Sequence, residues 1–438
     1  MPDLQPSRRQ LFQTAGATFT TSLFSGNLKG ANDRIAAGFI GTGRMGLSNL
    51  GIAMKQPALQ AVAVCDVYQP HLEEAVALAA KRGAQVKAVK DFREILADNS
   101  IDVICISTPD HWHAYMTVEA CKAGKDVYVE KPLCTYIEEG LKMVEAARKY
   151  KRVVQAGTMQ RSGIHFQKAV EIVRSGQLGK ITFCRTWNTS NQPREGYGNP
   201  ADSDPPPDLD WNMWLGPAPL RRFNANRWGV HPEMKRKPFP YFRYFWDYAG
   251  GALTDWGVHV LDIVHMAFNE PMPASTTALG GKFWITDNCE TPDTLVVTWQ
   301  YPEGFLATYE NRLANGEMPL GQGYGTMFHG TKGTLYVNRS FYRVFPERGS
   351  GLEPVEVKQS NNSNDAHWAN FLECIKTRQK PVSDIETCFR TTAACILGNI
   401  ALRSKLRVDW DDRAKTVLQK DARRYLAARY RKPWKLVV

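Results

Sequence analysis

The chain of 438 residues is long enough for two domains, and its 43% apolar and 23% charged residues are typical of a globular protein rather than a disordered one. The net charge is +11, but residues 401–438 alone hold 12 Lys or Arg against 4 Asp. Because the excess lies in one terminal segment without a nucleic-acid-reading motif, it favours a basic arm that packs on the protein itself or on a partner subunit. Nine cysteines without a Cys-x-x-Cys pair argue against a disulfide framework or a zinc site.

The N-terminal segment 1–33 contains a pair of arginines, Arg8 and Arg9, before a mildly apolar run at 14–24. That run is too short to span a bilayer, which takes about 20 apolar residues. The pattern is typical of a twin-arginine signal, which directs the export of folded proteins, and the alternative is a basic tail without a targeting role. We therefore expect a periplasmic or otherwise exported protein that uses the twin-arginine machinery. Any dinucleotide it carries must be held tightly, since none is available outside the cytoplasm.

A dinucleotide site is predicted at the start of the next segment. An apolar run at 36–40 reads as a buried strand and is followed by a glycine-rich turn and a helical stretch to Lys55. The strand predicted at 59–65 ends in Asp66, where a carboxylate receives the adenosine ribose hydroxyls. Asp66 would repel a 2′-phosphate and no Arg follows it directly, so NAD is favoured over NADP. The predicted contacts to the pyrophosphate are made by the turn Gly41, Thr42, Gly43, Arg44, Met45 and Gly46.

Strands and helices then alternate along the chain to about residue 157. Strands are predicted at 101–107, 126–129 and 153–156, and helices at 111–123 and 137–150. This alternation predicts an α/β fold with a doubly wound parallel sheet over residues 34–157. Ligands bind beyond the carboxyl ends of such strands, where the segments 108–113 and 130–132 lie.

Four motifs together resemble the Gfo/Idh/MocA oxidoreductase family, which includes glucose–fructose oxidoreductase and inositol dehydrogenase. They are Gly41-x-Gly43-x-x-Gly46, Thr108-Pro109 with His113, Glu130-Lys131-Pro132, and Gly250-Gly251-x-x-x-Asp255-x-x-x-His259. The resemblance covers residues 34–409. It implies that Lys131, Asp255 and His259 meet over the nicotinamide. It also implies a C-terminal α+β domain, residues 158–410, with a large, mostly antiparallel open sheet that commonly serves oligomerisation.

The residue types agree with that chemistry. Asp255 and His259 are four apart in a stretch with helical apolar spacing, so they share one face. A neutral His can accept a hydroxyl proton, a carboxylate can orient it, and a lysine ammonium can stabilise a developing alkoxide. The alternatives are a buried core histidine and a helix-capping Asp. A metal site formed by His259, Asp262 and His265 is a further alternative, but spacing by three is common by chance, and we predict no metal.

Aromatic residues are concentrated between residues 187 and 256, which contain six of the twelve tryptophans. Aromatic faces beside polar side chains suit a sugar, and the predicted substrate-binding residues are Arg161, Arg243, Tyr244 and Trp246. The alternative is an aromatic core with a dimer contact. The long irregular segment 188–237 is expected to be functional, whereas Trp211 and Trp214 look structural. Short antiparallel strands are predicted at 282–337, helices at 365–377 and 385–403, and a basic arm at 411–438.

Three functions remain. The first is an NAD-dependent oxidoreductase acting on a secondary hydroxyl of a sugar or cyclitol, as a homo-oligomer. The second is a glycoside hydrolase that oxidises a hydroxyl, eliminates the aglycone, adds water and reduces the ketone again. That cycle needs a further base, for which Tyr241, Tyr244 and His231 are candidates. The third is a non-catalytic sugar-binding protein, which the presence of the three predicted catalytic residues argues against.

Overall fold

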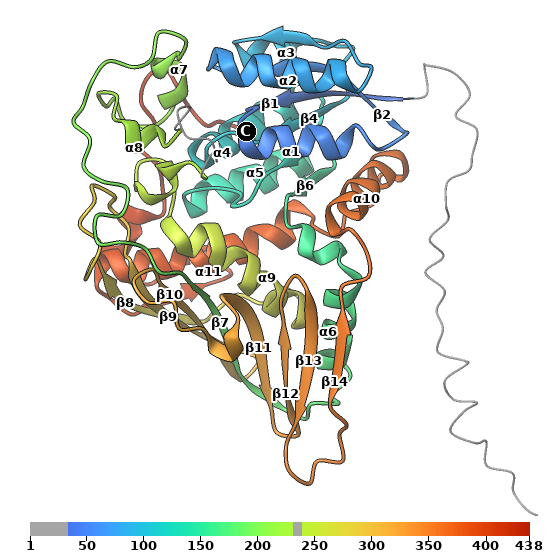
Figure 1. The fold of residues 1–438 in the computed structure, drawn as a ribbon, viewed down its shortest axis with the longest axis vertical. Coiled ribbons are helices and arrows are strands. Elements are labelled where there is room, and N and C mark those ends of the chain that lie inside the picture. The colour runs from blue at the N-terminus through green and yellow to red at the C-terminus, as the bar shows by residue number, and fades with distance from the viewer. Residues whose placement is uncertain (1–33, 231–238) are drawn as a thin grey trace, which may run out of the picture. The chain divides into compact units, whose positions relative to one another are not determined.

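Two β-sheets organise the part of the chain that this computed structural model describes, residues 34–230 and 239–438 (Figure 1). The predicted signal at 1–33 and the candidate base His231 lie outside the described residues. None of the described helices has both the length and the apolar character needed to cross a membrane.

The first sheet is parallel, with the strand order β3-β2-β1-β4-β5-β6 expected of a doubly wound fold. β4 and β5 are buried along their whole lengths because helices cover both faces of the sheet. The fold predicted for this region is therefore confirmed. The strands are β1 (Ile35–Ile40), β2 (Leu59–Cys65), β3 (Lys87–Val89), β4 (Val103–Ile106), β5 (Asp126–Val129) and β6 (Val154–Ala156). The helices are α1 (Arg44–Ala53), α2 (Gln69–Lys81), α3 (Phe92–Ala97), α4 (Asp110–Lys122) and α5 (Ile137–Lys149).

The second sheet has the strand order β14-β13-β12-β11-β7-β10-β9-β8-β15-β16. β7 and β10 run parallel and the other paired neighbours run antiparallel, so the expected mostly antiparallel sheet is confirmed. The strands are β7 (Ile181–Thr189), β8 (Ser275–Gly281), β9 (Thr294–Tyr301), β10 (Phe305–Arg312), β11 (Tyr324–Gly330), β12 (Gly333–Val337), β13 (Phe341–Pro346), β14 (Val355–Lys358), β15 (Val408–Asp411) and β16 (Thr416–Val417). Along β9, buried residues alternate with more exposed ones, because only one face of the sheet is covered. The covering helices are α6 (Ile164–Arg174), α9 (Val258–Ala267) and α11 (Ile385–Ser404).

Helices from the C-terminal half complete the core of the first sheet. Trp368 of α10 (Ser363–Thr377) stacks on Tyr128 of β5, with ring centroids 4.4 Å apart and planes at 9°. On the other side, Phe389 and Ile396 of α11 join the apolar cluster that contains Ile104 and Val127. The predicted boundary at residue 157 thus separates two sheets, but helix α11 packs in the cores of both. All nine cysteines are buried and free within these cores.

The long segment after β7 lies against the carboxyl edge of the first sheet. It contains two short helices, α7 (Trp211–Leu215) and α8 (Ala225–Trp228). The Gln69 amide donates to the Asp208 carbonyl and the Asp210 amide to the Val67 carbonyl, each at 3.0 Å. Trp211 and Trp214 are buried and stack on each other with centroids 4.6 Å apart, so both pack within the segment. The segment therefore covers the edge at which ligands are expected.

The basic arm packs on its own chain. After β16 it forms the short helix η6 (Lys420–Tyr425) and continues along α5, where the Tyr430 hydroxyl donates to Glu139 at 2.8 Å. Trp434 contacts the rings of Trp112 and Tyr115 edge-on, with centroids 4.9 Å and 5.2 Å apart. The terminal segment is thus part of the fold rather than a free basic surface.

We expect Trp434→Ala to lower the free energy of unfolding by about 2 kcal/mol. This is less than the about 3–5 kcal/mol of a fully buried aromatic, because the ring stays partly exposed. Urea unfolding measures the change, and Val437→Ala, at a position 58% exposed, is the matched control. Equal midpoints for the two variants would contradict the packing described for the arm.

Candidate active site

The glycine-rich turn between β1 and α1 admits no other residue at two positions. Gly41 has φ +80°, and a Cβ there would lie 2.7 Å from the Thr108 amide nitrogen. A Cβ on Gly46 would lie 1.9 Å from the Gly41 carbonyl oxygen. Gly43 precedes α1, and no side chain of the described residues caps that helix. The first-turn amides therefore remain available for a phosphate, as in dinucleotide-binding folds.

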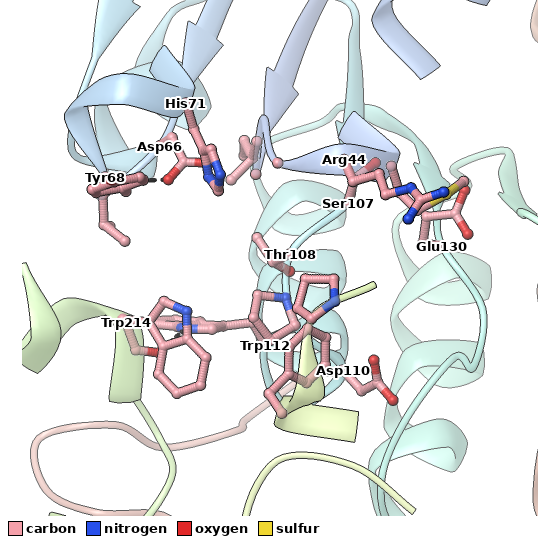
Figure 2. A pocket seen from close by; sticks show the side chains of 18 of the residues that line it. Arg44, Asp66, Tyr68, His71, Ser107, Thr108, Asp110, Trp112, Glu130 and Trp214 are labelled. Carbon is pink, nitrogen blue, oxygen red and sulfur yellow. Dashed lines mark hydrogen bonds and ion pairs between the residues drawn. The ribbon is translucent and has the colours of Figure 1, made fainter. Parts of the chain in front are cut away.

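Asp66 extends from the end of β2 toward the same turn. Its carboxylate accepts hydrogen bonds from the Thr42 amide at 2.7 Å and the Tyr68 amide at 2.9 Å. The His71 imidazole is 3.6 Å away. Figure 2 shows Asp66, Tyr68 and His71 together at one end of a pocket. The carboxylate is thus held in place from behind, with its free side toward the position expected for a ribose.

The pocket runs along the carboxyl edge of the first sheet and encloses about 1030 Å³, part of it open to solvent. Most of the predicted cofactor-binding residues line it: Gly41, Gly43, Arg44, Met45, Asp66, Thr108, Pro109, His113, Glu130 and Lys131. Thr42 and Gly46 lie behind this wall, where they hold Asp66 and pack on Gly41. The opposite wall comes from the long segment and the residues after it, namely Trp214, Trp228, Phe239, Phe242 and Arg243.

Lys131 and Asp255 form an ion pair at this pocket. The Lys131 ammonium donates to the Asp255 carboxylate at 2.6 Å and to its backbone carbonyl at 3.1 Å. Arg243 donates to the same carboxylate oxygen at 3.2 Å. Asp255 lies in a π-helical turn, η4 (Leu253–Gly257), which continues directly into α9. The structure therefore brings together Lys131, Asp255 and Arg243.

Burial and charge fix the protonation of two residues. Burial alone would raise the pKa of Asp255, but the charges of Lys131 and Arg243 outweigh it and hold that pKa well below its usual range. Burial, with Lys131 and Arg339, lowers the pKa of His259, so its imidazole is neutral near pH 7. The Nδ1 atom of His259 has no hydrogen-bond partner among the described residues. A neutral imidazole near an ammonium and a fixed carboxylate can accept a hydrogen bond from a hydroxyl and orient it.

His113 and Glu130 fix the loops that carry these groups. The two ring nitrogens of His113 lie 2.7 Å from the Pro132 carbonyl and 2.9 Å from the Thr108 carbonyl. Burial lowers the pKa of His113 to about 4, so the neutral ring donates to one of these carbonyls. Glu130 accepts from the Asn49 amide at 2.9 Å. Both residues thus position the loops after β4 and β5.

Comparison with known families agrees with this geometry. A family model described as "Oxidoreductase family, NAD-binding Rossmann fold" matches residues 35–158, and "Oxidoreductase family, C-terminal alpha/beta domain" matches residues 186–436. The chain belongs to the Gfo/Idh/MocA oxidoreductase family. The prediction made from its four motifs is confirmed at this level.

Curated relatives of this Gfo/Idh/MocA chain carry several names. A "Glycosyl hydrolase family 109 protein" of Shewanella sp. (strain W3-18-1) is 30% identical over 158 residues, which cover 34% of each chain. The chain thus spans about a third of the length of such relatives. The "Uncharacterized oxidoreductase YrbE" of Bacillus subtilis is 25% identical over 70% of this chain and 74% of its own. An "Inositol 2-dehydrogenase" of Rubrobacter xylanophilus is 28% identical over 48% and 56%.

Solved structures share the fold. A levoglucosan dehydrogenase in complex with NADH and levoglucosan has a TM-score of 0.64 at 18% identity, covering 86% of this chain and 99% of its own. The WlbA dehydrogenase of Bordetella pertussis, in complex with NADH and UDP-GlcNAcA, has a TM-score of 0.63 at 20% identity, with the same coverage. This chain therefore shares its two-sheet architecture with these solved structures.

The structure gives Arg161 a different role from the predicted one. Its guanidinium is buried and donates to Asp262 at 2.6 and 2.8 Å and to Glu270 at 2.8 and 3.0 Å. With both carboxylates satisfied inside the protein, Arg161 is a structural residue and not a sugar ligand. Asp262 is thus paired with Arg161, and the His265 ring lies 2.8 Å from the Tyr301 hydroxyl. Within residues 34–230 and 239–438, no group of three His, Cys, Asp or Glu could hold a metal ion.

Two other predicted sugar ligands also lie elsewhere. The Tyr244 ring stacks near Tyr197, with centroids 5.5 Å apart, and neither lines the pocket. The Trp246 amide donates to Glu290 at 2.8 Å, and its ring faces Arg403 in a separate small cavity. Tyr197 and Tyr244 pack against the aromatic cluster of the long segment, which includes Trp211 and Trp214, so of the four predicted substrate ligands Arg243 alone lines the pocket.

Arg339 and Asp110 are functional candidates that the sequence did not single out. Arg339 follows β12, and its guanidinium lies over the rings of Trp256 and Tyr324, with centroids 5.4 Å and 5.8 Å away. The charge of Arg339 also lowers the pKa of His259. A lone arginine in a turn carries no spacing that could have identified it, and neither does an aspartate at the start of a helix.

We expect Arg161→Leu to lower the free energy of unfolding by about 3–5 kcal/mol, because it leaves the buried Asp262 and Glu270 without their cation. Chemical unfolding measures this loss. Lys180→Leu, at an exposed position, is the control for losing one positive charge. If Arg161→Leu were as stable as the wild type but bound sugar more weakly, Arg161 would be a sugar ligand as first predicted.

Proposed function

We propose that the protein is an NAD-dependent oxidoreductase that acts on a secondary hydroxyl of a sugar or cyclitol and holds its cofactor tightly. The observation that carries the proposal is the 2.6 Å ion pair between Asp255 and Lys131, of which Lys131 lines the pocket that starts at the glycine-rich turn. A sugar substrate is supported by the NADH complexes of levoglucosan dehydrogenase and WlbA, which share the fold.

The pocket residues fit NAD. The uncapped amides of α1 suit a pyrophosphate, and Gly41 and Gly46 let the turn pack closely against its own backbone and that of Thr108. Asp66 suits the two ribose hydroxyls and would repel a 2′-phosphate, which favours NAD over NADP. When bound, NAD supplies a nicotinamide that can accept a hydride from a carbinol carbon.

The chain's own residues supply the rest of the chemistry. Lys131 is oriented by its ion pair with Asp255, so its ammonium can stabilise the negative charge that develops on the substrate oxygen. Arg243 shares that carboxylate and adds a second fixed cation at the pocket wall. Neutral His259 can accept the hydrogen bond of the hydroxyl and orient it. The substrate alcohol is thereby bound with its proton directed toward a base.

Tight retention of the cofactor is supported by the far wall of the pocket. Phe239 and Arg243 line it, and the Arg44 guanidinium of the glycine-rich turn lies 3.7 Å from the centre of the Phe239 ring. A dinucleotide between these walls is released only if one of them moves. Retention of this kind suits the twin-arginine export and periplasmic location expected for the chain.

Assembly into a homo-oligomer is proposed through the open face of the second sheet. Leu279, Val296 and Leu306 lie on three neighbouring strands and are 83%, 46% and 42% exposed. Exposed apolar residues grouped on one face are typical of a surface that another protein covers.

A redox-neutral glycoside hydrolase is the second candidate, favoured by the family 109 relatives. Their similarity covers 158 residues, about a third of each chain, so it does not extend to a whole relative. The route requires a further base for a C–H proton. Tyr241 and Tyr244 both stack on Tyr197 instead of lining the pocket, so neither is supported as that base.

We expect the purified protein to contain bound dinucleotide and to reduce it when given the correct sugar, without added NAD. Near-ultraviolet absorbance and mass spectrometry of the released cofactor report both. Lys131→Ala should slow this reduction by about 10²–10³-fold, since it removes the donor to the developing oxyanion. Its cofactor content should not change, and Lys180→Ala, at an exposed site, should behave as wild type. Unchanged turnover in Lys131→Ala would overturn the mechanism.

Nitrophenyl glycosides separate the two candidates. Release of nitrophenol without added cofactor, with solvent deuterium at the sugar carbon next to the oxidised one, is expected of the hydrolase alone. Free-sugar oxidation with no such release favours the oxidoreductase.

A further inference from the structure

Asp110 is a carboxyl in the pocket that the mechanism has not used. It is the first residue of α4, directly after Pro109, and is 5% exposed. It lines the pocket together with Lys131 and Arg243. In Figure 2 it lies at the end of the pocket opposite Asp66. A carboxyl at this end faces the charged groups proposed to act on the substrate.

The Asp110 carboxyl differs from the other carboxyls of the pocket in its partners. Asp66, Glu130 and Asp255 each accept hydrogen bonds from other residues. Among the described residues, only the backbone amide of Asp110 itself is directed at the Asp110 carboxyl. A carboxyl that lines the pocket and has no other partner among the described residues is free to hydrogen-bond a polar ligand bound there.

The charges around Asp110 leave it able to gain or lose a proton near neutral pH. Burial raises its pKa to about 7, and the nearby Asp255 reinforces this. Arg243 and Lys131 act in the opposite direction and limit the rise. His113 and Glu130 also line the cavity, and the thiol of Cys134 lies within electrostatic range. A group with this pKa is populated in both forms, as an acid–base catalyst requires.

Neither Asp255 nor His259 is suited to hold the proton that the reaction releases, which leaves Asp110 as the candidate. Asp255 is tied to two cations and stays ionised, so it cannot hold a proton near neutrality. His259 has a lowered pKa, which makes it a hydrogen-bond acceptor but a poor final holder of a proton. Oxidation of an alcohol releases one proton, and a water-poor pocket needs a residue to hold it.

We propose that Asp110 is a second acid–base residue of this site, which contacts the bound sugar and takes up the proton of the hydroxyl that is oxidised. The proposal rests on the proposed function. The O–H bond breaks and its proton passes to the Asp110 carboxylate, while its electron pair forms the second C–O bond. The C–H bond breaks and its electron pair leaves as hydride to the nicotinamide. In the reverse direction, reduction of the ketone takes the hydride from the nicotinamide and the proton from Asp110.

The first test needs no turnover. Difference infrared spectroscopy of the cofactor-containing protein across pH follows the carboxyl stretch. We expect one buried carboxyl to titrate near pH 7, to disappear in Asp110→Asn and to persist in Glu130→Gln, the matched buried carboxyl. A titration that persists in Asp110→Asn, or none outside the ordinary acidic range, would overturn the proposal.

The second test is single-turnover reduction of the bound cofactor by the sugar. In the wild type the rate should rise with pH through about 7, because the ionised carboxylate is the proton acceptor. Asp110→Asn should lose this dependence and slow by about 10²–10⁴-fold at unchanged cofactor content. Asp110→Glu should restore part of the rate and a pH dependence.

The two proposals fail differently. Wild-type rate and pH profile in Asp110→Asn would overturn the role of Asp110 and leave the oxidoreductase intact. A wild-type protein that transfers hydride from no sugar would overturn the proposed function, and with it this role for Asp110.

Discussion

The ion pair between Lys131 and Asp255 is the constraint on which the rest of the site depends. Lys131 follows β5 of the first sheet, and Asp255 lies in the π-helical turn that leads into α9 over the second sheet. Two such charges leave water at a cost, and the pair is favourable only because Arg243 and the Asp255 carbonyl complete the hydrogen bonding. Helix α11 packs in the cores of both sheets and so links the elements that carry Lys131 and Asp255.

That pairing decides which neighbouring groups can carry protons. Asp255 is held ionised beside the Lys131 ammonium, so this carboxylate contributes a fixed charge to the site and does not store a proton near neutral pH. Burial, with Lys131 and Arg339, lowers the pKa of His259, whereas burial raises the pKa of Asp110, which has no salt-bridge partner among the described residues. In this cluster Lys131 and Asp255 form an ion pair. His259 can accept a hydrogen bond, and Asp110 can accept a proton.

The predictable part of the site is the part encoded locally. Gly41, Gly46 and Asp66 act through a single turn and the strand beside it, so spacing along the chain was sufficient to identify them. Arg161 shows why the rest was not predictable: its partners, Asp262 and Glu270, lie about 100 residues away, and an arginine satisfied by them looks the same in sequence as one directed at a sugar. Tyr244 and Trp246 were misassigned for the same reason, because aromatic residues are equally common in cores and in sugar sites.

The pocket also links cofactor binding to folding. Its near wall forms with the first sheet, but its far wall needs the long segment after β7, which is held there by backbone hydrogen bonds from Gln69 and Asp210. A dinucleotide that binds between these walls stabilises the folded chain by mass action and is enclosed as the far wall packs. Loading therefore belongs to the compartment where the chain folds. Export after folding, the route expected from the N-terminal arginine pair, is the one that would keep such a cofactor in place.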